Sequence, residues 1–97
     1  RKKTQQKKET MRLKLAFGRK ILWLQFPEHG KVDVARVLEA VKERHPEVFD
    51  RWCDRKGRLH SSLSVFVNGE HIRYRKGMDT LLQEGDEVYV IPLMAGG

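Results

Sequence analysis

The chain has a single cysteine, Cys53, and no apolar stretch that approaches the length of a membrane span. One cysteine excludes an internal disulfide framework and fits a reducing compartment, so we expect a cytoplasmic protein. A transmembrane helix needs about 20 consecutive apolar residues, and the apolar stretches here are far shorter. No apolar run directly follows the basic N-terminus, which argues against a signal peptide. We interpret Cys53 as a half-buried small hydrophobe near Trp52 rather than as a redox or catalytic group.

Patterns typical of metal sites and catalytic sites are also missing. The four histidines are scattered without the spacing of metal ligands, and Cys53 and His60 are too few for a zinc site. No Ser-His-Asp order, glycine-rich phosphate loop or paired carboxylate stands out. A charged turn beside a strand accounts for the cluster of Glu84, Asp86 and Glu87. We therefore expect a protein that binds no metal and no cofactor and is not an enzyme.

The positive charge is concentrated at one end of the chain. The 97 residues suffice for one small domain, with a net charge of +7. Residues 1–10 carry five cations and one anion, which leaves +3 for the remainder. We predict that residues 1–10 form a disordered basic leader, with Met11 as a plausible natural start.

A small RNA-binding domain is the alternative from another class of protein. The pI near 9.9, the basic leader and the cations Arg73, Arg75 and Lys76 support it. Because most of the excess charge lies in the leader, nucleic acid is not the partner that we favour.

Hydrophobic patterning predicts an α+β domain over residues 11–93. Alternating or continuous apolar runs predict strands at 12–17, 21–26, 64–67, 70–74 and 87–93. A helix begins after Asp33, which can cap it, and ends near His45 because Pro46 follows. Its apolar stripe consists of Val34, Val37, Leu38 and Val41.

The remaining segments are connections. Asn68-Gly69 is a strong signal for a two-residue hairpin turn, because both residues tolerate positive φ. Residues 47–63 are hard to interpret, although Val48, Phe49 and Trp52 could form one short helical turn. A second short helical turn is expected at 79–82. One helix packed across one mixed sheet would bury these apolar faces economically.

The last strand is expected to present two different faces. Val88 and Val90 should face the helix, which leaves Tyr89, Ile91 and Leu93 on the other face. Together with Phe66 they would form an exposed apolar patch, the predicted partner-docking surface. Scattered surface hydrophobes are the alternative interpretation.

The chain continues beyond this strand as a thin tail, Met94-Ala95-Gly96-Gly97. Glycine lacks a Cβ, so its backbone can enter a slot that rejects other residues. The four residues can extend by about 14 Å. We predict that 94–97 is a flexible tail that threads into a partner's active site and presents the Gly97 carboxylate as a reactant.

Several segments together resemble the ubiquitin-like sulfur carrier proteins of the MoaD/ThiS family. They read VFVNGE at 65–70, DTL at 79–81, GDEV at 85–88, IP at 91–92 and AGG at 95–97. The resemblance implies a β-grasp fold, with a mixed sheet of four to five strands and one main helix packed across it. The connection at 47–63 is long for a minimal member.

The resemblance also implies a chemistry. An ubiquitin-activating-type adenylyltransferase would use ATP and Mg²⁺ to adenylate Gly97, and sulfur would then replace AMP to give a thiocarboxylate. An enzyme such as a molybdopterin synthase large subunit would accept the sulfur. The receiving pathway stays open among molybdopterin, cysteine, thiamine and tRNA thiolation. A protein modifier conjugated through Gly97 and an accessory subunit of a synthase are the alternatives within the fold.

Overall fold

A computed structural model describes residues 10–27, 31–61 and 63–91 of the chain. It contains two helices, α1 (Val34–Arg44) and α2 (Pro46–Arg51), and two 3₁₀ turns, η2 (Ile72–Tyr74) and η3 (Gly77–Asp79). The strands are β1 (Met11–Phe17), β2 (Lys20–Phe26), β3 (Ser64–Val67), β4 (Glu70–His71) and β5 (Glu87–Ile91).

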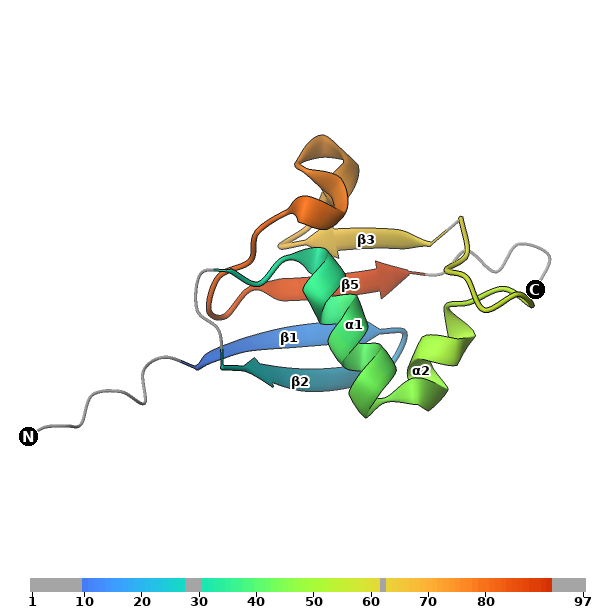
Figure 1. Ribbon diagram of the computed structural model, residues 1–97. Helices are drawn as coiled ribbons and strands as arrows, with labels where there is room; N and C mark the ends of the chain where they lie inside the picture. The colour runs from blue at the N-terminus through green and yellow to red at the C-terminus, as the bar shows by residue number, and fades with distance from the viewer. Residues whose placement is uncertain (1–9, 28–30, 62, 92–97) are drawn as a thin grey trace, which may run out of the picture.

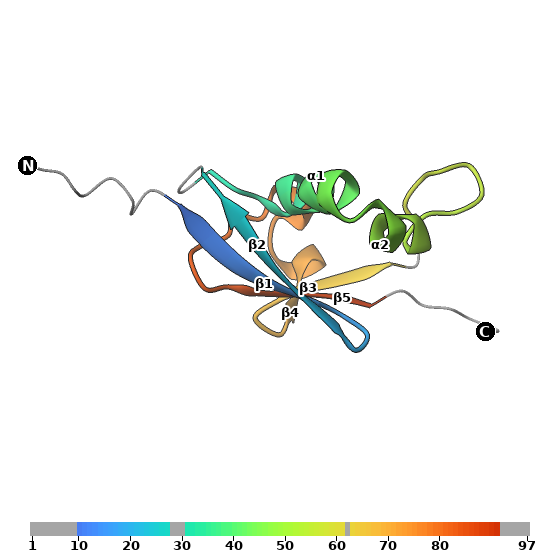
Figure 2. The same cartoon turned by 90° about the horizontal axis from the view of Figure 1, so that it is seen from below.

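The strands form one mixed sheet in the order β2-β1-β5-β3-β4. The central pair β1–β5 is parallel, and the other pairs are antiparallel. Helix α1 crosses one face of the sheet and α2 lies on the same side (Figures 1 and 2). No helix of the described residues covers the opposite face, which we call the open face. This arrangement confirms the predicted α+β architecture of five strands and one main helix.

Helix α1 follows the sequence prediction closely. The Asp33 carboxylate accepts a hydrogen bond from the Arg36 backbone N–H at 2.9 Å, which makes Asp33 the N-cap. All four residues of the predicted stripe are buried, and they belong to the same hydrophobic core as Val88 and Val90 of β5. The helix ends before His45, as Pro46 predicted, and Pro46 then begins α2.

Three segments differ from the prediction. The expected helical turn at 48–52 is longer and earlier, because α2 spans Pro46–Arg51. The expected strand 70–74 pairs only over Glu70–His71, since the His71 side chain accepts from the Arg73 N–H and starts η2. The expected turn at 79–82 is displaced to η3, because the backbone at 80–82 pairs with 32–34 instead.

The Asn68-Gly69 turn forms as predicted and also joins two parts of the chain. Asn68 and Gly69 have φ values of 52° and 88°. The Asn68 amide group donates to the Asp86 carboxylate at 3.0 Å, and its oxygen accepts from the Glu87 N–H at 3.0 Å. Asn68 therefore fixes the β3–β4 hairpin to the turn before β5.

We expect Asn68→Ala to lower the free energy of unfolding by about 1–2 kcal/mol, because it removes two hydrogen bonds and places alanine at positive φ. Urea denaturation measures this loss. Asn68→Gly keeps the backbone conformation and loses only the side-chain bonds, so its loss should be smaller. Wild-type stability in both variants would contradict the role given to this side chain.

Candidate functional site: the open face of the sheet

The open face of the sheet carries a row of side chains to which every strand contributes one. Strand pairing places Ile21, Ala16, Tyr89, Phe66 and His71 side by side across β2, β1, β5, β3 and β4. The residues before and after Tyr89, Val88 and Val90, are buried on the helix side, so this row faces away from the core. We call these five residues the sheet row.

The sheet row is mainly apolar, and all its members except the buried Ala16 are partly exposed to solvent. The side chains of Ile21 and Tyr89 are 53% and 37% exposed. Phe66 is half-buried, and its ring lies edge-on to His71 with centroids 5.0 Å apart. Ile91 extends the row toward the end of β5 and is 46% exposed. A contiguous exposed apolar surface of this kind is typical of protein-binding faces.

A hollow lies where the sheet row meets the end of β5. It has a volume of about 530 Å³ and is lined by 16–18 of the β1–β2 hairpin and by 89–91 of β5. Ile91, the last residue of β5, lines the hollow, so the hollow lies at the C-terminal end of that strand. A partner that covers the sheet row would therefore sit beside the point where the chain leaves β5.

The other end of the open face is charged and carries an exposed tryptophan. Trp23 is 61% exposed, and the Arg12 guanidinium lies 5.7 Å from its ring centroid. Lys14, which pairs with Trp23 across β1 and β2, forms an ion pair of 3.9 Å with Glu87. This end adds cation–π and ionic contacts to the apolar row.

Only part of the predicted docking surface lies in the described structure. Tyr89 and Ile91 are exposed on the face opposite the helix, as predicted, and Phe66 lies between them and β4. Leu93 and the predicted threading residues 94–97, including Gly97, lie outside the described residues. Their roles, and docking itself, stay predictions.

Sequence analysis did not include four residues of the open face in the predicted docking surface: Ala16, Ile21, Trp23 and His71. Side chains alternate between the two faces along a strand. Because Leu22, Leu24 and Phe26 of β2 point toward the core, the residues between them point to the open face, and this alternation could have been used in the prediction. His71 could have been found as well, because a two-residue turn at Asn68-Gly69 pairs Phe66 with His71 and so places both on one face.

Cys53 lies on the helix side and not on the open face. Its thiol donates to the Phe49 carbonyl at 3.4 Å, and burial together with the Asp50 and Asp54 carboxylates raises its pKa. A raised pKa lowers the fraction of reactive thiolate, in line with the structural interpretation of Cys53.

Across the described ranges, no three His, Cys, Asp or Glu side chains gather as metal ligands would. No helix in those ranges is long and apolar enough to cross a membrane.

Comparison with protein-family models shows the family to which this chain belongs. The ThiS family model matches residues 23–97, from β2 to the final glycine. The chain belongs to the ThiS family. Relatives within reach of this family are named sulfur carrier proteins, and the observed sheet and helix are the β-grasp fold that was predicted.

Individual relatives agree with this assignment. A putative sulfur carrier protein of Archaeoglobus fulgidus is 33% identical over 67 residues, which cover 69% of this chain and 76% of the relative. The sulfur carrier protein CysO of Mycobacterium tuberculosis is 39% identical over 63 residues, 63% of this chain and 68% of CysO.

A solved structure supports the fold. The small archaeal modifier protein 1 of Methanosarcina acetivorans superposes with a TM-score of 0.69 at 22% identity, covering 91% of this chain and 98% of that one. At this identity the likeness concerns the fold alone.

Proposed function

We propose that this protein is a sulfur carrier whose Gly97 carboxylate is activated by adenylation and converted to a thiocarboxylate. The observation that supports this most strongly is the ThiS family match, which runs through Gly96 and Gly97. The related proteins named sulfur carriers in Archaeoglobus fulgidus and Mycobacterium tuberculosis point the same way. ATP and Mg²⁺ belong to the activating partner, and this chain supplies the reacting carboxylate.

The chemistry explains why activation is needed. A carboxylate is a poor electrophile because it is charged and lacks a good leaving group. Attack of the Gly97 carboxylate on the α-phosphate of ATP forms an acyl adenylate and releases pyrophosphate. Hydrosulfide then forms a C–S bond to the carbonyl carbon, and the C–O bond to AMP breaks. The product is a thiocarboxylate, whose anionic sulfur is a nucleophile at neutral pH.

The domain would contribute docking and exclusion of water. An activating enzyme bound on the sheet row would receive the tail as it leaves β5, beside the hollow formed by residues 16–18 and 89–91. Enclosing the terminus in a dry pocket protects the adenylate from hydrolysis until sulfur arrives.

The direct test is the intact mass of the full chain after incubation with a ubiquitin-activating-type adenylyltransferase, ATP, Mg²⁺ and sulfide. Replacement of one oxygen by one sulfur at the C-terminus is expected, and omission of ATP should prevent it. An unchanged mass with an enzyme that thiocarboxylates another ThiS member would contradict the proposal. Adding candidate acceptor enzymes, including a molybdopterin synthase large subunit, would identify the pathway.

Conjugation to other proteins is the second candidate. The same activated carboxylate would react with a lysine amine instead of sulfide, giving an isopeptide bond. The overall likeness to an archaeal modifier protein is why we retain it, although that likeness concerns the fold. Slower-migrating adducts that depend on Gly97 in cell extracts would favour this function.

Docking through the open face predicts a kinetic effect of Ile91→Glu. Because Ile91 is 46% exposed, the domain should fold normally, while a buried carboxylate at the interface should raise the KM of the activating enzyme for the carrier about tenfold or more. Leu81→Glu is the matched control, since Leu81 is 57% exposed and lies away from the sheet row. Equal KM values for the two variants would place docking elsewhere.

A further inference from the structure

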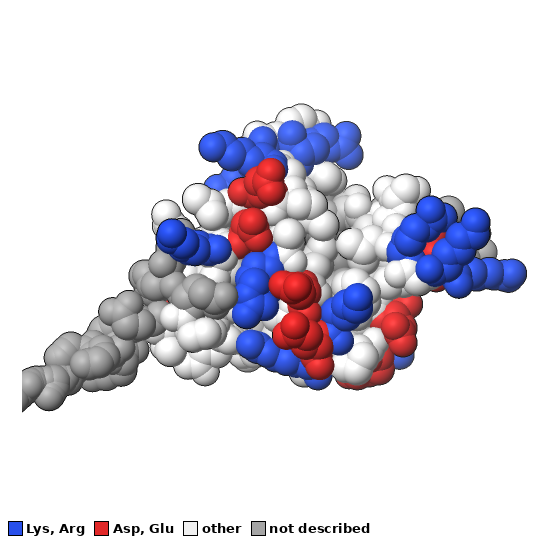
Figure 3. Space-filling view, in the orientation of Figure 1, with Lys and Arg blue, Asp and Glu red and all other residues white. Residues whose placement is uncertain are grey.

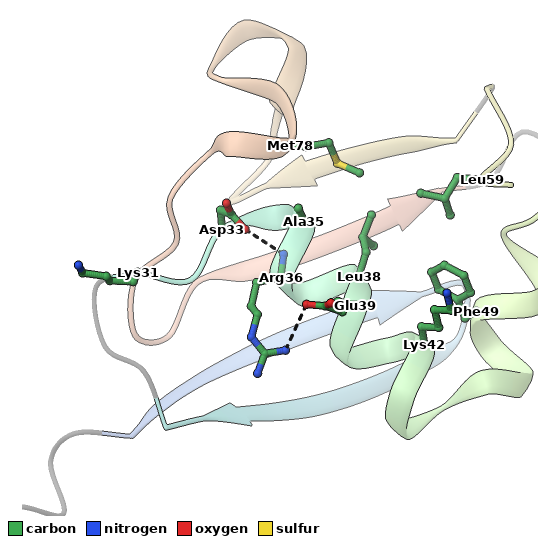
Figure 4. Close-up of a pocket in the computed structure, with 10 residues that line it drawn as sticks. All are labelled: Lys31, Asp33, Ala35, Arg36, Leu38, Glu39, Lys42, Phe49, Leu59 and Met78. Carbon is green, nitrogen blue, oxygen red and sulfur yellow. Dashed lines mark hydrogen bonds and ion pairs between the residues drawn. The ribbon is translucent and has the colours of Figure 1, made fainter.

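The helix side of the molecule has a second surface, an apolar groove that sulfur carriage through the open face leaves unused. It has a volume of about 550 Å³ and lies between α1, η3 and the loop after α2. Figure 4 shows Met78 and Leu59 reaching from η3 and from the loop toward Ala35 and Leu38 of α1. The Phe49 ring lines the groove as well, with the Lys42 ammonium 6.0 Å from its centroid. We call this surface the helix-side groove.

The groove is built to accept apolar side chains. Met78 is 39% exposed, and Leu59 is partly exposed beside the core. Methionine is flexible and polarisable, so it adapts to the shape of a bound side chain. The volume is within the range of a few hundred Å³ that is typical of small binding clefts.

Cationic side chains gather beyond two sides of the groove. Lys and Arg residues cluster over the η2–η3 segment and over the loop after α2, with white surface directly between the two clusters and charged side chains of both signs over α1 (Figure 3). The first cluster consists of Arg73, Arg75 and Lys76, and the second of Arg51, Arg55, Lys56 and Arg58. Within the described ranges, Arg75 pairs with Glu70 and Arg58 with Asp54, while Lys56 and Lys76 have no ion pair.

The loop that bears the second cluster has a defined conformation. The Asp54 carboxylate accepts from the backbone N–H groups of Lys56 and Arg58 at 2.9 and 3.0 Å. The bond from Arg58, followed by that from Lys56, lowers the pKa of Asp54 and keeps it ionised. The His60 N–H donates to the Trp52 carbonyl at 2.8 Å and closes the loop onto α2.

The lining of the groove carries more positive than negative charge, with three cations, Lys31, Arg36 and Lys42, and two carboxylates, Asp33 and Glu39. Asp33 caps α1, and Glu39 pairs with Arg36 at 3.9 Å. Lys31 also lines the groove and has no ion pair to another described residue. The surroundings of the apolar floor therefore favour a ligand with negative charge.

We infer that the helix-side groove binds an amphipathic helix of a partner protein, with an apolar stripe in its middle and acidic residues toward both ends. The stripe would lie on Ala35, Leu38, Leu59 and Met78, and the acidic ends would meet the two cationic clusters. A second copy of this chain would bring the same cations and is disfavoured. RNA fits the clusters but not the mainly aliphatic floor, because bases stack on aromatic rings.

The two faces of the domain could then be occupied at once, because α1 lies on the side of the sheet opposite the sheet row (Figure 2). Binding in the helix-side groove would be independent of the proposed sulfur chemistry. A carrier with both surfaces could be held on one protein while an activating enzyme occupies its open face.

The test is an NMR titration of the ¹⁵N-labelled full chain with a designed helical peptide of about 14 residues, long enough to span roughly 20 Å. The peptide carries leucines at i, i+3, i+4 and i+7 and glutamates at both ends. One control peptide has lysines in place of the glutamates, and another has serines in place of the leucines. A uridine oligonucleotide is titrated separately.

We expect amide shifts at Ala35, Leu59 and Met78, and binding of the acidic peptide at least about tenfold tighter than that of either control peptide. Met78→Glu should weaken binding by about tenfold, and Lys56→Glu and Lys76→Glu by about threefold each. Lys20→Glu, an equal charge change at the start of β2, should have no effect.

Three results would overturn the inference. They are absence of saturable binding by the acidic peptide, equal binding of the lysine peptide, and equal weakening by Lys20→Glu and Met78→Glu. Tighter binding of the oligonucleotide with shifts at the same amides would assign the surface to nucleic acid instead. The intact-mass test of sulfur loading is unaffected by any of these results.

Discussion

Gly96→Val is expected to lower the rate of Gly97 thiocarboxylation by at least about hundredfold, since misplacing a reacting group by 1 Å can cost that much. The proposed mechanism threads the C-terminal residues through a narrow passage into the activating enzyme. Glycine passes because it has no Cβ, and a branched side chain at the penultimate position should block the passage.

Intact mass over time, with the activating enzyme, ATP and sulfide, measures this effect. Met94→Val is the matched control, because position 94 already carries a large side chain. Thermal unfolding of both variants should match the wild type. A normal rate for Gly96→Val would contradict threading, whereas the appearance of a thiocarboxylate in the wild type would still support sulfur carriage.

Trp52→Ala should lower the free energy of unfolding by about 3–5 kcal/mol, the range observed when a large buried aromatic is truncated. The Trp52 side chain is fully buried, and its ring lies 5.3 Å from that of Phe17 and 6.1 Å from that of Phe49. It therefore joins α2 to the end of β1. Because small domains are only marginally stable, this loss is a large part of the total.

Trp23→Ala is the matched control for this prediction, since the same residue type is 61% exposed there and should cost less than about 1 kcal/mol. Trp52→Phe should cost far less than Trp52→Ala. The Trp52 indole N–H is buried without a hydrogen-bond partner among the described residues, so its removal offsets part of the lost packing. Urea titration gives all three values, and similar losses for Trp23→Ala and Trp52→Ala would contradict the anchoring role.

Trp52 also accounts for the part of the chain that sequence analysis left uninterpreted. In the connection at 47–63 the apolar residues recur with neither the period of a helix nor that of a strand, so neither element was predicted over most of it. In the structure α2 brings Val48 and Trp52 into the core, and an isolated bridge pairs Cys53 with Leu59. The connection is thus an ordered extension of the core that also carries one wall of the helix-side groove.

The elements predicted correctly depend on short-range signals. Asp33 caps a helix whose apolar stripe follows within eight residues, and Asn68-Gly69 folds back through two positive φ angles. The alternation of β5 placed Tyr89 and Ile91 opposite Val88 and Val90. In each case the physical cause lies within one turn of helix or one strand, so the sequence predicts it.

Tertiary structure decided the length of β4, the position of η3 and the composition of both surfaces. His71 ends its strand because its side chain caps η2. Residues 80–82 are not helical because their backbone forms hydrogen bonds with the segment at 32–34. The sheet row exists only because strand register places two hairpins and β5, which are distant in the chain, side by side.

By itself, the amino-acid sequence determined the fold class, the main helix, the hairpin turn and the family resemblance of the segments near Gly97. Only the folded chain decided that Ile21, Trp23 and His71 share a face with Tyr89, and that Met78 and Leu59 line one groove. The reason is physical: helix caps, turns and periodicity act between near neighbours, whereas a surface is set by strand register and packing between residues far apart in the chain.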